Sequence, residues 1–128
     1  MAEHTVENDP VVDPTALVRL EALGGETLLR EMARLYLENA ELRVAQIGRG
    51  LAAGGELSDA EAGAHSLKSS AANLGATRVA RLANGIERAV QEGEVGVAAE
   101  LYPALVRAAA GAAAELGRRV NPTAGETP

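Results

Sequence analysis

Apolar residues recur every three to four positions along most of the chain, the spacing that places them on one face of an α-helix. The first such stretch follows Asp13-Pro14, a favourable helix start because aspartate can cap free backbone N–H groups and proline is tolerated in the first turn. It carries Leu17 and Leu20, and we expect it to end at Gly24-Gly25. The pattern therefore predicts a short helix near the beginning of the chain.

A longer helix is predicted to follow and to run to Ala53, because Gly54-Gly55 is a strong helix break. We expect its core-facing stripe to consist of residues at helical spacing with Tyr36 alongside, namely Leu28, Met32, Leu35, Asn39 and Leu42.

A third helix is predicted to begin at Ser58-Asp59-Ala60-Glu61. This segment has the form of a capping box, in which the serine hydroxyl and the glutamate carboxylate each satisfy a backbone N–H. The helix is expected to end at Gly75 and to bury a stripe of small and branched residues, namely Ala60, Ala64, Leu67, Ala71 and Leu74.

A fourth helix is predicted between Thr77, which can cap it, and Gly93. Asn84-Gly85 is a turn-forming dipeptide inside this segment. The apolar stripe continues on both sides of it, so we expect the helix to continue as well; the stripe is Val79, Leu82, Ile86 and Val90.

The last helical segment extends from Val95 to about Val120, and Pro103 is expected to kink it or to delay its regular start. Helices joined by short glycine-containing breaks pack best as antiparallel neighbours. We therefore expect an all-α protein: an antiparallel up-down four-helix bundle with an additional short N-terminal helix. It would occupy residues 10–120, between flexible tails at residues 1–9 and 121–128. The stripe of the last helix is Leu101, Leu105, Val106, Ala109, Ala113 and Leu116.

Composition narrows the class of protein. Hydrophobic residues make up 47% of the chain, but there is no Phe or Trp, so the core must be built from Ala, Leu, Val and Ile. The absence of cysteine excludes disulfides and thiolate chemistry. A net charge of −6 without a basic face argues against nucleic-acid binding, and no apolar run reaches the roughly 20 residues that span a membrane. The polar N-terminus is unlike a secretory signal, so we expect the protein to lie in the cytoplasm. We also expect it to be a monomer.

His65 is the most informative residue in the sequence. On the third helix it lies away from the apolar stripe, with Ser69 and Ala72 on the same side and Lys68 one turn further on. A neutral imidazole is a competent nucleophile near neutral pH, and a nearby ammonium can offset phosphoryl charge without competing as an acceptor. The small side chains of Ser69 and Ala72 would let a partner's active site approach the ring.

The fourth helix can supply a partner for the imidazole. Ala80, Asn84, Glu87 and Gln91 form a row beside its core stripe. If this helix packs beside the third, Glu87 or Asn84 could accept the second ring N–H of His65 and fix its tautomer. We also expect Asn84 to belong, with Ser69 and Ala72, to the surface on which a partner docks. Two further carboxylates, Glu61 and Glu31, have no predictable place at the site. His4 lies in the expected tail and is assigned no role.

The ordered stretch Ala64-His65-Ser66-Leu67-Lys68-Ser69-Ser70-Ala71-Ala72-Asn73-Leu74-Gly75-Ala76 resembles the signature of histidine-containing phosphotransfer (HPt) domains of bacterial phosphorelays. The segment from Arg78 to Glu87 is similar to the stretch that follows the signature in this family, with Ile86 in place of leucine. Ser69 stands where glycine is commoner. The likeness extends as a helical pattern over about residues 10 to 118.

This resemblance implies that His65 is the phosphorylated residue, Lys68 its charge partner, Gly75 the helix-ending glycine and Glu87 the polar residue near the imidazole. It implies receiver domains of response regulators or a hybrid sensor histidine kinase as partners. The protein would be a phosphocarrier rather than an enzyme, since the sequence has no glycine-rich phosphate loop or nucleotide-binding pattern. It would hold no cofactor or metal itself, and the magnesium ion would belong to the partner's acidic pocket.

Other functions remain open on the sequence alone. A non-catalytic helical module could bind and regulate a signalling partner on the same scaffold, although such binding does not require the nucleophile. An oligomerisation domain with an incidental histidine is a further alternative, which the alanine-rich faces of the last helix leave open. A phosphatase or metal enzyme would need a second base or ligand cluster, which the sequence lacks. The sequence also leaves open whether this is a free-standing protein or part of a hybrid sensor kinase.

Overall fold

The computed structural model describes residues 9–120, and these fold into four α-helices without a β-strand. The helices are α1 (Pro14–Leu51), α2 (Leu57–Asn73), α3 (Thr77–Gln91) and α4 (Val95–Val120). The all-helical prediction is thus confirmed for this part of the chain. The predicted tails at residues 1–9 and 121–128, including His4, lie outside the described residues except for Asp9.

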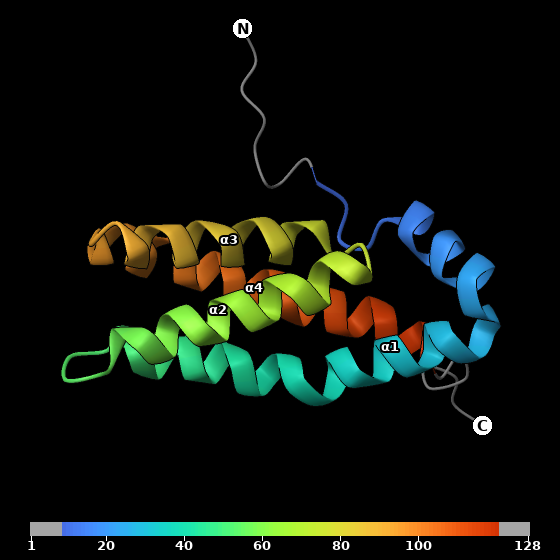
Figure 1. The fold of residues 1–128 in the computed structure, drawn as a ribbon, viewed down its shortest axis with the longest axis horizontal. Coiled ribbons are helices and arrows are strands. Elements are labelled where there is room, and N and C mark those ends of the chain that lie inside the picture. Colours follow the sequence, from blue (N-terminus) through green and yellow to red (C-terminus); the bar gives the residue numbers. More distant parts are fainter. Residues whose placement is uncertain (1–8, 121–128) are drawn as a thin grey trace, which may run out of the picture.

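The helices form a closed ring in which each contacts two neighbours: α1 with α2, α2 with α3, α3 with α4, and α4 with α1. Figure 1 shows the chain turning back at each of the three connections between helices. The fully buried side chains at the centre come from all four helices, and the largest are Tyr36, Ile47, Leu67, Leu74, Ile86, Leu105 and Leu116. α2, which carries His65, is therefore held between α1 and α3.

α1 contains a break at Gly24 and Gly25. Gly25 has φ +72° and ψ −171°, and Gly24 is also non-helical, so two helical pieces meet here within one continuous element. Figure 1 shows the first piece set at a clear angle to the rest of α1. At its start, Asp13 is the N-cap predicted from the sequence, and its carboxylate accepts a 3.0 Å hydrogen bond from the backbone N–H of Thr15.

The core-facing stripe predicted for the long part of α1 is wrong. Leu35 and Leu42 are 54% and 65% exposed. The buried face lies about one residue, or 100°, around the helix, and includes Tyr36 and the small residues Ala33 and Ala40. Apolar residues lie on more than one side of α1, and the face that packs against α2 and α4 combines large residues such as Tyr36 and Ile47 with small ones such as Ala33 and Ala40.

Two predicted helix caps are also wrong. α2 begins at Leu57, so Ser58 lies inside the first turn, and the N-cap is Glu56, which makes no side-chain capping bond. The Glu61 carboxylate instead accepts a 2.8 Å hydrogen bond from the Gln91 amide of α3. Thr77 is the first residue of α3 rather than its cap, and its hydroxyl donates to the carbonyl oxygen of Gly75 at 3.2 Å.

The two irregular features expected inside later helices have different outcomes. α3 runs through Asn84-Gly85 without a break, as the apolar stripe predicts. α4 begins at Val95 and continues through Pro103, so the proline does not delay the helix. Pro103 and Ala99 are both exposed, so the Ala99 carbonyl that loses its helical donor remains accessible to water.

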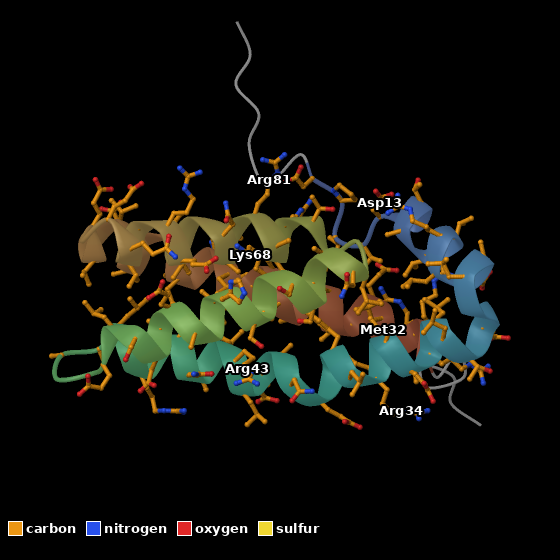
Figure 2. The ribbon with its side chains drawn as sticks, in the orientation of Figure 1. Asp13, Met32, Arg34, Arg43, Lys68 and Arg81 are labelled. Atoms are coloured by element: carbon orange, nitrogen blue, oxygen red, sulfur yellow. The ribbon has the colours of Figure 1, made fainter. Side chains whose placement is uncertain are left out.

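Asp9, which the sequence analysis placed in the N-terminal tail, is buried in the structure. Its carboxylate pairs with the Arg81 guanidinium at 2.8 Å, and its backbone carbonyl accepts a 2.7 Å hydrogen bond from Arg78 Nε. Figure 2 shows Arg81 beside this N-terminal segment. The backbone N–H of Asp13 then donates to Gly75 at 2.8 Å, which ties the segment to the turn between α2 and α3.

The Tyr36 hydroxyl has no hydrogen-bond partner among residues 9–120, although the side chain is only 1% exposed. Burial raises the pKa of Tyr36 to about 12. A buried hydroxyl without a partner costs stability, so we expect Tyr36→Phe to raise the free energy of unfolding by about 1 kcal/mol. Urea denaturation checks this. A loss of stability would show that the hydroxyl is bonded to a buried water.

Candidate functional site

His65 projects from the outer face of α2, with its side chain 64% exposed. The opposite face of α2 fixes the helix, because Ala64, Leu67 and Ala71 are fully buried. Between Ala62 and Asn73 the helix contains no acidic residue, in a chain whose net charge is −6. The imidazole is therefore presented on a fixed helix, and the part of α2 that follows it adds no negative charge.

Glu87 of α3 meets the imidazole at one nitrogen. Its Oε2 lies 2.8 Å from His65 Nδ1, and the Glu87 side chain is only 8% exposed. Of the two residues proposed from the sequence to accept the second ring N–H, the structure thus places Glu87 at the ring. A carboxylate at Nδ1 favours the tautomer with hydrogen on Nδ1, which leaves the lone pair on Nε2.

Lys68 binds the other oxygen of the same carboxylate. Its Nζ lies 2.6 Å from Glu87 Oε1 and 3.4 Å from Asn84 Oδ1. Figure 2 shows Lys68 on the side of α2 that faces α3. The single carboxylate of Glu87 therefore joins the imidazole and the ammonium, one at each oxygen.

The charge on Glu87 reflects two opposed effects. Burial by itself raises the pKa of a carboxyl group, but the hydrogen bonds and positive charges of Lys68 and His65 outweigh it and hold the pKa of Glu87 below its ordinary value. Glu87 is consequently ionised at neutral pH. The negative charge of Glu87 is therefore held in one place in the site by its two hydrogen-bond donors, Lys68 and His65.

This pKa makes the stability of the fold depend on pH. Because the pKa of Glu87 is lower in the folded than in the unfolded chain, the carboxylate stabilises the fold above its ordinary pKa near 4.5. The contribution is lost as pH falls through the lower pKa of the folded state. We expect Glu87→Gln to be about 1–3 kcal/mol less stable than the unmodified protein at neutral pH, and the difference to shrink as the pH is lowered through the depressed pKa of Glu87. Urea denaturation across this range checks it; a difference independent of pH would contradict it.

The other predicted site residues lie around this cluster. Ser69 and Ala72 are exposed on the outer face of α2, while Asn84 is half-buried and contacts Lys68. Glu61 bonds to Gln91 across α2 and α3, on the far side of His65 from Lys68 along the helix. Glu31 lies on the exposed surface of α1 beside Arg34 and Glu38.

A groove between α1 and α2 was missed by the sequence analysis. Asn39 and Arg43 from α1 and Ser66 and Ser70 from α2 line it, with Leu35 at its edge. The sequence did show Leu35, Asn39 and Leu42 on one face of a helix, but the sequence analysis assigned that face to the core. Leu35 and Asn39 instead line this groove, and Leu42 is exposed.

Residues 9–120 give no indication of a metal site or of a membrane-spanning helix. No group of three His, Cys, Asp or Glu side chains in this part of the chain is placed to hold a metal ion. None of the described helices is long and apolar enough to cross a membrane.

An all-helical bundle with an exposed histidine on one helix, hydrogen-bonded to a carboxylate on the next, has the features of a histidine phosphocarrier. Residues 31–115 match the family model of the Hpt domain. This match covers more than half of the chain, and the protein belongs to the Hpt domain family. Searches of curated proteins and of solved structures gave no significant match.

Membership in this family assigns the chain to two-component signalling. Hpt domains carry a phosphoryl group on histidine, act as phosphocarriers rather than enzymes, and interact with receiver domains and kinases in phosphorelays. The resemblance found in the sequence is thereby confirmed at the level of the family.

Proposed function

We propose that this protein is a phosphorelay intermediate in which His65 is the phosphoacceptor. It takes a phosphoryl group from the aspartyl phosphate of a receiver domain, or of a hybrid sensor kinase, and passes it to a response-regulator receiver. The observation that carries the proposal is the exposed imidazole whose Nδ1 lies 2.8 Å from Glu87 Oε2, because this contact leaves Nε2 for the reaction.

In the proposed step, the Nε2 lone pair of His65 attacks the phosphorus of the aspartyl phosphate. The N–P bond forms as the P–O bond to the aspartate breaks, and the aspartate leaves as a carboxylate. The ring becomes a phosphorylated imidazolium with its hydrogen on Nδ1, and the Glu87 carboxylate stabilises the new positive charge. Transfer to the next receiver reverses these bond changes, and the positive charge of Lys68 lies near the phosphoryl group.

The scaffold in this proposal is an antiparallel up-down four-helix bundle with a short N-terminal helix before Gly24. The binding face for receivers is the outer surface of α2 and α3 with the adjoining part of α1, where Ser69 and Ala72 leave room around His65 and Asn84 lies at the edge. The part of α2 from Ala62 to Asn73 carries no acidic residue, which suits a partner with an acidic phosphorylation pocket. Magnesium would be held by that pocket, and the carrier itself would work in the cytoplasm as a monomer without a nucleotide or cofactor.

The direct test is phosphoryl transfer from a panel of phosphorylated receiver domains to the full chain. Label that appears on the protein and shows the acid lability and base stability of phosphohistidine would support the proposal. Failure of every donor to label the folded protein would overturn it in favour of an interaction module that binds its partner without phosphate chemistry.

Bulk placed on the binding face should obstruct transfer without disturbing the fold. Ala72 is exposed two turns from His65 on the same side of α2, so we expect Ala72→Trp to slow phosphoryl uptake at least about tenfold. Ala114→Trp is the matched control, because Ala114 is exposed on α4, which lies across the ring from α2. Rates from one phosphorylated receiver measure the effect. Equal rates for the two variants would show that the partner does not approach over Ala72.

A further inference from the structure

We propose that the segment Thr5-Val6-Glu7-Asn8 of this chain occupies the groove between α3 and α4 beside Arg88, where it competes with an approaching receiver. The placement of the segment is independent of the proposed function. The competition with a receiver rests on that function.

The residues before α1 fix the direction in which the chain reaches α3. The backbone N–H of Asp13 donates to Gly75 at 2.8 Å, just before α3 begins. The Asp9 carbonyl then accepts from Arg78, and its carboxylate pairs with Arg81 one turn further along α3. Read backwards from Asp13 to Asp9, the chain therefore follows α3 from its first turn toward its middle (Figure 1). Residues before Asp9 are thus directed toward the second half of this helix.

The surface between α3 and α4 is hollowed along this path. The first part of the groove already contains Val11 of the arriving segment. The second part begins at Arg81 and runs past Arg88, with Val97 and Leu101 of α4 on its other wall. Val97 is 44% exposed there. The chain thus fills one part of the groove, and the next part lies open directly beyond the anchored end of the described chain.

The spacing of residues before Asp9 matches this open part. In an extended chain of about 3.3 Å per residue, Glu7 lies about 7 Å and Val6 about 10 Å beyond Asp9. Arg88 follows Arg81 by about 10 Å, at about 1.5 Å per helical residue. Arg88 is exposed and makes no hydrogen bond or ion pair within residues 9–120. Glu7 can therefore pair with Arg88 while Val6 covers the apolar wall of α4.

Charge at the far end of the groove limits the length of the docked segment. Glu92 and Glu94 line that end, and they would repel Glu3, so we place only residues 5–8 in the groove. An exposed ion pair binds weakly on its own. The anchor at Asp9 makes the contact intramolecular, which raises the local concentration of the segment and populates the docked state.

Asn84 connects this groove with the receiver face. It lines the groove between α3 and α4, and it also contacts Lys68 at the edge of the surface around His65. A docked segment therefore covers the α3 edge of the face proposed for receivers. Because its contacts are weak, a receiver can displace it, and the segment lowers the apparent affinity for the receiver rather than blocking transfer.

The position of the segment can be measured by NMR in the full chain. A nitroxide spin label on His4→Cys, in a chain without other cysteines, broadens the amide signals of residues close to it. We expect the strongest broadening at residues 92–97. Glu7→Arg and Arg88→Glu should each remove it, and the double variant should restore it by reversing the ion pair. Arg49→Glu is the matched control, since Arg49 is likewise an exposed arginine in the last turn of its helix, and it should change nothing.

Two NMR results would overturn the placement. One is broadening that decreases evenly with distance from Asp9 in every direction. The other is broadening at residues 92–97 that persists unchanged in both Glu7→Arg and Arg88→Glu.

Phosphoryl uptake from a receiver tests the competition. If the segment covers the site about half of the time, Glu7→Gln should lower the receiver concentration at half-maximal rate about twofold, without changing the maximal rate. Glu3→Gln removes an equal charge outside the groove and should have no effect. An unchanged concentration in Glu7→Gln, or an equal change in Glu3→Gln, would overturn the competition. If no receiver labels the unmodified protein, the proposed function fails, while the NMR result still decides where the segment lies.

Discussion

The variant His65→Gln is expected to take up no phosphoryl group from any receiver while keeping the helical circular dichroism of the unmodified protein. The His65 side chain is 64% exposed, so its removal leaves the packing of α2 intact. A glutamine amide can still donate to Glu87, which avoids leaving a buried carboxylate short of a partner. The amide nitrogen is not nucleophilic, so only the chemistry is lost.

The experiment measures labelled phosphate on the protein after mixing with a phosphorylated receiver, beside circular dichroism of the same samples. His4→Gln removes the other histidine in the chain and should label like the unmodified protein. Label on His65→Gln would mean that the acceptor is another residue. Loss of helical signal would instead assign His65 a structural role.

The contact between His65 and Glu87 could be anticipated from the sequence because both residues lie on short helices with regular apolar stripes. The apolar stripes of α2 and α3 orient both helices, and His65, Lys68 and Glu87 take their places relative to those stripes. The family resemblance added the pairing of the two segments. What helical spacing could not supply was the direction of each side chain across the interface, and so Asn84 was assigned to partner binding rather than to Lys68.

The helices could be predicted from the sequence, but the side of α1 that packs into the core could not. In α1 the apolar residues occupy more than one side of the helix, so periodicity alone admits two choices. Choosing the larger residues placed Leu35 and Leu42 in the core, whereas the ring of four helices buries Ala33 and Ala40. Burial of Asp9 was equally beyond the sequence, since it depends on arginines that come from α3.

A comparison of the glycines that end α2 and α3 separates the effect of backbone geometry from the effect of packing at Gly75. α2 and α3 both end with a glycine in the left-handed region, Gly75 at φ +72° and Gly93 at φ +77°. After each, the next backbone N–H returns to a carbonyl in the last turn, from Ala76 to Ala71 at 2.9 Å and from Glu94 to Ala89 at 2.7 Å. The two motifs differ in surroundings. A Cβ on Gly75 would lie 2.6 Å from the Cβ of Ala16, whereas nothing lies within 4 Å of one on Gly93.

Gly75→Ala is therefore expected to lower the free energy of unfolding by about 2–5 kcal/mol, and Gly93→Ala by only about 1–2 kcal/mol. Both variants force alanine into the left-handed region, but only the first also pushes apart the start of α1 and the turn before α3. That displacement would break the hydrogen bond from Asp13 N–H to the Gly75 carbonyl. Urea denaturation of the two variants, followed by circular dichroism, isolates the packing cost as their difference. Equal losses would mean that the N-terminal segment moves away from Gly75 at little cost, and that its attachment contributes little to holding α2 and its histidine in place.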